Sequence, residues 1–392
     1  MNRRMGSAVN PNIKDVARSI GVSYKTVSRV INGGEHVTPE MRQRVEAAIA
    51  TLRYQPDHTA QSLRRGRTQT LRLVIVRRFE RFLTEPFIDE VVSGIVDAAA
   101  EAGYAILLEA INPQPDAGSS VAPGRRADGS IIIDGRQDNP AIRPEHLVGH
   151  PYVMIPTRPN APEADWVYAD FRGGAREVTT HLIAQGHTRI GHLAGRLSLP
   201  ERDRLRGYRD ALTAVGIPID PTLVVVAGHL RHHGASAMAK LLDRRPDLTA
   251  VFAVNDLTAL GAMEFAQQRG LRIPDDVSIA GFDDIYLAGY ANPPLTTVRL
   301  PAYEMGRAAT QRLIATIGVD AGTDARTDGG ESNRTELRKG QLFPVEIVPR
   351  GSVCPPREGS GRRPTPPVAD GALARPDHST GSVDGARQTP ER

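Results

Sequence analysis

Short apolar runs alternate with amphipathic stretches along most of the chain, beginning near residue 71. The first series has apolar runs at 71–76, 104–110, 130–134 and 152–155, with an amphipathic stretch at 87–102. The second has apolar runs at 189–195, 223–228, 250–256 and 277–284, between helices that begin near Gly173, Glu201, Gly234 and Leu257. Such alternation is typical of parallel sheets covered on both faces. The two series predict an α/β core of two doubly wound parallel-sheet lobes.

The first 55 residues have a purely helical pattern. Apolar positions at helical spacing predict three short helices: Gly21 ends the first, Ser23 caps the second, and Thr38 with Pro39 opens the third. The apolar faces can close one small core, made by Val16, Ala17, Ile20, Val27, Val30, Ile31, Met41, Val45, Ala48, Ile49 and Leu52. Residues 10–55 are therefore predicted to form an all-α headpiece with a helix-turn-helix.

The positive charge is concentrated in this headpiece and just after it. The chain has 392 residues and a net charge of +4. The first 67 residues hold twelve Lys and Arg against five acids, so the rest of the chain is net negative. A small basic helical domain is attracted to nucleic-acid phosphates by counterion release. Charge alone leaves open a second interpretation, an ordinary three-helix bundle with a solvated surface.

Two segments carry a family resemblance. IKDVARSIGVSYKTVSRVIN at 13–32 and VTPEMRQRVEAAIATLRYQPDHTAQSLRRGRTQTLRLVI at 37–75 resemble the lac repressor family (LacI/GalR) of bacterial transcription regulators. The match runs without a gap into the first core strand. It implies a DNA-binding repressor with a periplasmic-binding-protein-like core at about 69–354, a homodimer on a pseudo-palindromic operator, and control by a small-molecule effector such as a sugar.

Within the headpiece, the second helix is expected to lie in the major groove, because its N-terminal residues face base edges in helix-turn-helix proteins. Lys25 or Arg29 can donate to guanine, and Tyr24 can pack on a thymine methyl. The resemblance assigns base reading to these three residues. Phosphate contacts are expected from Ser23, Thr26, Ser28 and Asn32, for which simple capping or solvation is the alternative.

Residues 56–68 are expected to be a hinge and linker. The segment 57–64 after Pro56 could form two helical turns with Ala60 and Leu63 on one side, but a helix this short is marginal in water by itself. In the resembled family this segment folds on operator DNA and wedges a leucine, matched here by Leu63, into the minor groove. The alternative is that Leu63 packs on the core.

The candidate effector site lies beyond the carboxyl ends of the strands, where open α/β sheets bind ligands. Asn255 and Asp256 follow one strand, Asp283 and Asp284 follow another, and Asp170 lies at the expected lobe crossing near Ala169. The resemblance points to Arg204, Asn255 and Asp283 as effector ligands, and Asp170 and Phe87 complete the expected set. The alternative role for these acids and amides is helix capping, which is stronger for Asp256 and Asp284.

The core is expected to divide into an N-lobe, at about 69–168 and 298–318, and a C-lobe, at about 169–297 and 340–353. The chain departs from the family pattern at three places. Three prolines argue against a regular helix at 112–126, and 320–339 reads as a polar, mobile insertion. Phe171 stands where a polar residue is common; its ring either stacks on a sugar or shields the lobe crossing. The tail at 355–392 is expected to be disordered, without the leucine heptads of a coiled coil.

The rest of the composition narrows the class of protein to which the chain can belong. The only cysteine, Cys354, excludes an internal disulfide and a multi-cysteine metal site. The N-terminus has no apolar signal region and no run is long enough for a membrane helix, so a cytoplasmic location without membrane contact is expected. We find no catalytic motif of the GxSxG, P-loop or GxGxxG kind, and the histidines at 229, 232 and 233 make a weak zinc site. We expect no enzyme, no cofactor and no metal; a transport binding protein or an enzyme on this core is the rival class.

Overall fold

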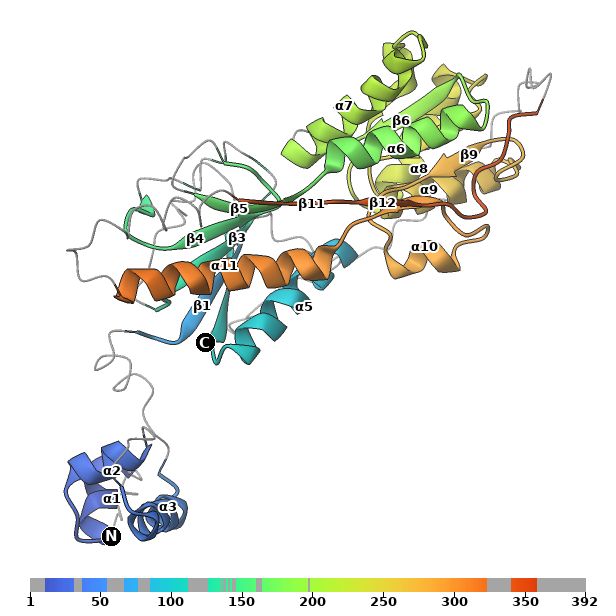
Figure 1. Cartoon of the computed structure of the whole chain (residues 1–392). Coiled ribbons are helices and arrows are strands. Elements are labelled where there is room, and N and C mark those ends of the chain that lie inside the picture. The colour runs from blue at the N-terminus through green and yellow to red at the C-terminus, as the bar shows by residue number, and fades with distance from the viewer. Residues whose placement is uncertain are drawn as a thin grey trace, which may run out of the picture.

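A computed structural model gives the arrangement of the chain (Figure 1). It describes residues 11–31, 37–54, 67–76, 85–111, 126–134, 136, 139, 142, 146–159, 164–196, 198–322 and 340–357. The predicted hinge with Ala60 and Leu63, as well as Asn32, lies outside the described residues. So do nearly all of the 112–126 segment, the insertion from 323 to 339 and the tail from 358 onward.

The headpiece has the three predicted helices, α1 (Ile13–Ser19), α2 (Tyr24–Ile31) and α3 (Pro39–Leu52). The Ser23 hydroxyl caps α2 by accepting from the Thr26 amide at 3.1 Å, and the Thr38 hydroxyl caps α3 by accepting from the Met41 amide at 3.3 Å. Val16, Val27 and Val45, one from each helix, are fully buried. The predictions of the capping residues and of the shared apolar core are therefore both confirmed.

The N-lobe is built on a parallel sheet with the strand order β11-β5-β4-β3-β1-β2. Its strands are β1 (Thr70–Val76), β2 (Ala105–Ile111), β3 (Gly129–Ile133), β4 (Tyr152–Ile155), β5 (Asp165–Ala169) and β11 (Gln341–Phe343). Two helices, α5 (Pro86–Glu101) and α11 (Ala302–Gly322), pack together over one face. They approach closely because Gly94 and Gly306 each face backbone of the other helix.

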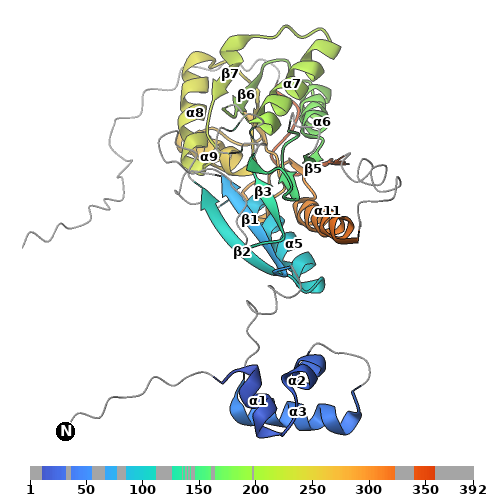
Figure 2. The same ribbon diagram turned by 90° about the vertical axis from the view of Figure 1, so that its left-hand side faces the viewer.

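The C-lobe has a second parallel sheet, β7-β6-β8-β9, made of β6 (Ile190–Ala194), β7 (Val224–Val226), β8 (Ala250–Ala253) and β9 (Ser278–Ala280). Helices α6 (Phe171–Ala184) and α7 (Leu199–Ala214) cover one face, and α8 (Arg231–Arg244) and α9 (Asp256–Gln268) cover the other (Figure 2). Phe252 packs in the core shared with α6 and α7, and its neighbour Val251 packs in the core shared with α8 and α9. The two-lobe parallel architecture is confirmed.

Three segments join the lobes. One runs from β5 into α6, the second is β10 (Thr297–Arg299), and the third holds β11 and β12 (Glu346–Val348), with β12 antiparallel to β10. The sequence LFPVEIVPRG at 342–351 predicts a single last strand, but this prediction is wrong: the strand is broken at Pro344, which has no backbone N–H to continue a ladder. Because β11 pairs with β5 of the N-lobe, the expectation that all of 340–353 belongs to the C-lobe is also wrong.

Further elements were not predicted. They are the short helix α10 (Tyr286–Tyr290), the 3₁₀ turn η4 (Pro221–Leu223), the strand β10 and the long helix α11. The α11 helix continues to Gly322, so the first residues of the expected 320–339 insertion are helical. Among the helices that the structure describes, none has the length and apolarity to cross a membrane.

Candidate functional site

The outer face of α2 is the candidate nucleic-acid surface. Tyr24, Lys25 and Arg29 are all exposed, and Lys25 and Arg29 stand one helical turn apart on the same side. Thr26 is half-buried beside the capping hydroxyl of Ser23. Ser28, expected to contact phosphate, is only 8% exposed, so its hydroxyl is not on this open face. The face therefore presents two cations and one aromatic ring.

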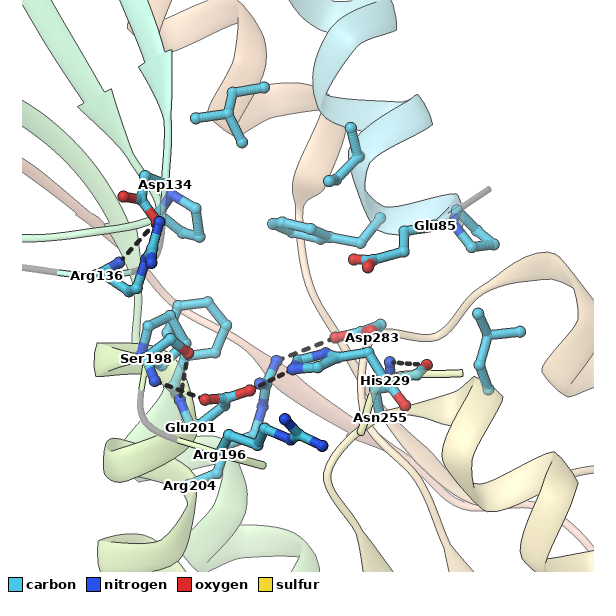
Figure 3. A pocket seen from close by; sticks show the side chains of 18 of the residues that line it. Glu85, Asp134, Arg136, Arg196, Ser198, Glu201, Arg204, His229, Asn255 and Asp283 are labelled. Carbon is cyan, nitrogen blue, oxygen red and sulfur yellow. Dashed lines mark hydrogen bonds and ion pairs between the residues drawn. The ribbon is translucent and has the colours of Figure 1, made fainter. Parts of the chain in front are cut away.

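A cleft between the lobes is the candidate effector site (Figure 3). Its cavity volume is about 410 Å³, within the size range of small-molecule pockets. The lining comes from the carboxyl ends of strands in both sheets, where the loops after β1, β3 and β4 face those after β6, β7, β8 and β9. Parallel strands end at the same edge of a sheet, so both lobes bring their loops to one place.

Arg204 and Asp283 meet at the C-lobe side of this cleft. Arg204, from α7, donates through Nη2 to Asp283 Oδ1 at 3.2 Å, and both side chains are nearly buried. The Arg204 guanidinium also lies over the rings of Phe171 and Phe282, at 4.7 Å and 4.4 Å from their centroids. Phe171 is 1% exposed and packs on Arg204 and the crossing, which favours the shielding role, although its side chain also lines the cleft.

Burial raises the pKa of Asp283 to about 6, although the charges of Arg204 and His229 lower it. The backbone of Asp283 has a φ of 113°, a left-handed conformation that is strained for a residue with a side chain. Its own N–H is tied to the Val298 carbonyl at 2.8 Å in the crossing strand. The carboxylate is thus held in the cleft by the crossing strand, and because its pKa is raised it ionises less readily than an ordinary aspartate and titrates near pH 6.

Two more of the expected effector residues, Asn255 and Phe87, line the same cleft. Asn255 Oδ1 accepts from the Thr258 amide at 2.9 Å and so caps α9, while its Nδ2 donates to the His229 carbonyl at 3.1 Å. Capping and cleft lining are therefore combined in one side chain. Phe87 stands at the start of α5 and faces the cleft from the N-lobe.

Asp170 is placed elsewhere. Its carboxylate accepts from the Gly173 amide at 2.8 Å and caps α6, and it is not among the residues that line the cleft. Asp256 is fully buried and accepts from the Thr297 hydroxyl and the Ile285 amide; burial raises its pKa well above the ordinary value. Asp284 pairs with Arg299 and Arg350. The capping alternative therefore holds for Asp170, but it is wrong for Asp256 and Asp284, which hold other loops and strands in place instead of capping the helix that follows.

Several lining residues were missed by sequence reasoning. His229 Nε2 contacts Glu201 Oε1, and Glu201 Oε2 accepts from the Ser198 amide at 2.6 Å in the capping box of α7. On the N-lobe side, Asp134 follows β3 and pairs with Arg136. The rule that found Asp283 would have found Asp134 and His229 as well, because each follows a strand.

Two further charged residues that sequence reasoning missed are Glu85 and Arg196, which Figure 3 shows on opposite sides of the cavity. The sequence around His229 predicts a loop that includes His232 and His233, but this prediction is wrong: both lie in the first turn of α8. Within the described part of the chain, no three His, Cys, Asp or Glu side chains gather as a metal site.

Comparison with known proteins finds matches to both the headpiece and the core. Residues 12–57 match the family described as bacterial regulatory proteins, lacI family, and residues 179–353 match a periplasmic binding protein-like domain. The HTH-type transcriptional regulator CelR of Thermobifida fusca is 36% identical over 309 residues, which cover 78% of this chain and 91% of that protein. The chain belongs to the LacI family. LacI-family proteins are transcription regulators, not enzymes, so the resemblance inferred from the headpiece is confirmed.

Two solved structures of LacI-family proteins match most of the chain. A complex of the transcriptional regulator CelR with cellobiose has 34% sequence identity and a TM-score of 0.64, and covers 87% of this chain and 99% of that one. The lac repressor dimer bound to operator and the anti-inducer ONPF has 26% identity and a TM-score of 0.73, over 88% of this chain and 100% of that one. This LacI-family chain therefore shares the whole domain order of both relatives.

Proposed function

We propose that this LacI-family regulator represses transcription as a homodimer that binds a pseudo-palindromic operator and responds to a sugar bound in the interlobe cleft. The observation that carries the proposal is the cleft, to which both lobes contribute strand-end polar side chains in a chain that also bears a basic helix-turn-helix. The operator-bound lac repressor dimer and the cellobiose complex of CelR support it by similarity. We therefore also propose a cytoplasmic location, where the protein would meet its operator DNA.

On the DNA side, Tyr24, Lys25 and Arg29 read bases, and Ser23 and Thr26 contact phosphates. All but Thr26 are exposed; Ser23, Tyr24 and Lys25 lie at the N-terminus of α2, the part of a recognition helix that faces base edges, and Arg29 lies one turn further on. The hinge residues Ala60 and Leu63 and the headpiece residue Asn32 complete the proposed interface. Two headpieces in a symmetric dimer would each read one half-site, so that the symmetry of protein and operator match.

A mobility-shift assay with the DNA upstream of the protein's own gene tests this part. We expect Lys25→Ala and Arg29→Ala each to weaken specific binding by about 1–3 kcal/mol, the usual value of a good base contact. Lys240→Ala is the matched control, since Lys240 is an exposed lysine on α8 of the core. If Lys25→Ala and Lys240→Ala bind the operator equally well, α2 does not read bases and the proposed interface is wrong.

On the effector side, Arg204, Asn255 and Asp283 are the proposed sugar ligands, with Phe87 offering an apolar surface and His229 a ring nitrogen. Amide, carboxylate and guanidinium groups together can donate to and accept from the hydroxyls of a sugar. Thermal-shift screening with mono- and disaccharides tests the cleft, because a ligand that binds only the folded state raises the unfolding temperature. A response to nucleosides and purines but to no sugar would replace the proposed effector class.

A further inference from the structure

One carboxylate outside the cleft joins the two lobes. Asp203, on α7 of the C-lobe, accepts at Oδ2 from the Tyr168 hydroxyl at 2.9 Å and from Arg158 Nη2 at 3.3 Å. Tyr168 belongs to β5 and Arg158 follows β4, so both donors come from adjacent strands of the N-lobe sheet. The Asp203 side chain is 6% exposed. A nearly buried carboxylate of one lobe therefore accepts two hydrogen bonds from the other lobe.

The donors are themselves held in place. The Arg158 guanidinium lies 4.4 Å from the centroid of the Tyr168 ring and 5.9 Å from that of Trp166, so it packs on the sheet edge instead of extending into solvent. Tyr168 is 1% exposed, and burial together with the charge of Asp203 raises the pKa of its hydroxyl, which stays a donor at every physiological pH. The N-lobe thus presents a preformed pair of donors to Asp203.

The position of Asp203 in α7 connects this contact to the cleft. The next residue in the helix is Arg204, which pairs with Asp283, and two residues before Asp203 is Glu201, which contacts His229. A shift of the first turns of α7 would therefore move two cleft side chains together. We propose that Arg158 and Tyr168 are positioning residues of the effector cleft, which hold Asp203 and with it the cleft-lining turns of α7 against the N-lobe. This inference rests on the proposed effector function of the cleft.

A matched control exists on the same carboxylate. Arg206, one turn along α7, donates through Nη1 to Asp203 Oδ1 at 2.9 Å, but it belongs to the same helix as Asp203. Arg158 and Arg206 are both partly exposed. Removing either one takes a positive charge from Asp203, whereas only the loss of Arg158 cuts a connection between the lobes.

The first readout needs no effector. Hydrogen exchange of the ligand-free full chain, followed over residues 199–206, should be faster in Arg158→Leu and in Tyr168→Phe than in the wild type. It should be unchanged in Arg206→Leu, and Arg158→Lys should restore most of the protection. Exchange in Arg158→Leu that equals the wild type, or that is matched by Arg206→Leu, would overturn the proposal, because the contact would then be local charge compensation.

The second readout is calorimetric titration with cellobiose, the sugar bound by the relative CelR. Arg158→Leu should weaken binding by about two- to tenfold, the range expected for the net loss of one typical hydrogen bond, because Arg158 is partly exposed, and Arg206→Leu should leave it unchanged. Equal affinity in wild type and Arg158→Leu counts against the positioning role. If the wild type binds no sugar at all, the sugar proposal fails, and the exchange experiment still decides whether Arg158 and Tyr168 hold α7.

Discussion

Titration of Asp283 should make effector binding depend on pH in a narrow range around 6. Its pKa is raised from 3.8 to about 6, with burial as the largest cause. Above this pH the carboxylate is ionised and can accept hydrogen bonds from sugar hydroxyls. Below it, the protonated group is a weaker acceptor and releases Arg204 from its ion pair. Effector affinity is therefore expected to be high at pH 7 and above and to fall as the pH drops below 6.

The magnitude follows from the position of the pKa. With a pKa of about 6, roughly nine tenths of the protein is ionised at Asp283 at pH 7 and roughly one tenth at pH 5. If only the ionised form binds, affinity drops by about tenfold over this interval. The free energy of unfolding of the ligand-free protein should depend on pH in the opposite direction. Because the pKa of Asp283 is higher in the folded than in the unfolded chain, ionising this group costs the folded state roughly 3 kcal/mol. Its contribution to stability is therefore full below pH 3.8 and is lost as the pH rises to 6.

Calorimetric titration with the sugar selected by thermal shift, between pH 5 and 8, measures the effect. Asp283→Asn is the control: its affinity should be lower at pH 7 and should vary less with pH. Asp134 needs the same test with Asp134→Asn, because burial raises its pKa as well and it lines the same cleft. Circular dichroism must show that each variant is folded, since Asp283→Asn leaves Arg204 without its carboxylate. Affinity that is constant between pH 5 and 7 in the wild type would refute the role given to Asp283.

The other predictions concern packing and capping. Gly94→Ala should destabilise the core by about 3 kcal/mol, because its methyl group would lie 2.0 Å from the Tyr303 carbonyl oxygen and force α5 and α11 apart; thermal unfolding measures this. Gly318→Ala on α11 meets nothing within 4 Å and should not destabilise, so equal losses in both variants would contradict the packing explanation. Asp170→Ala should lower the stability by about 1 kcal/mol, as the loss of a helix cap does, and should leave the sugar affinity unchanged. Weaker sugar binding in this variant would mean that Asp170 is an effector ligand after all.

The layout of the fold was predictable from local pattern. Buried parallel strands are almost continuously apolar, and in the helices between them the apolar positions recur every three to four residues. Each of the two series therefore predicts its own strands and helices. The C-terminal crossing was not predictable in this way. β11 and β12 have three residues each, and their partners, β5 and β10, lie far away in sequence. The ten-residue sequence around Pro344 does not predict which half of it pairs with the N-lobe sheet and which half pairs with β10.

The cleft was predictable at positions that follow a strand. Asn255 and Asp283 follow β8 and β9 within a few residues and were predicted; Asp134 and His229 follow β3 and β7 in the same way and should have been predicted. The same rule failed for Asp170, since β5 is the strand that crosses between the lobes. Its end turns at once into α6, and the side chain is used as the cap of that helix.

The pairing of charges in the cleft could not be predicted, because each partner comes from a different element or from a loop of irregular shape. Asp283 meets Arg204, Asp134 meets Arg136, and Glu201 meets His229. Among the cleft residues that the structure describes, three arginines stand against four carboxyl groups, with Glu85 and Arg196 as the remaining members. Such a cavity has no excess of positive charge with which to bind an anion. Paired charges still leave unused lone pairs and N–H groups, which an uncharged polyol can satisfy without burying a net charge, so the charge pattern of the cleft itself favours a neutral sugar.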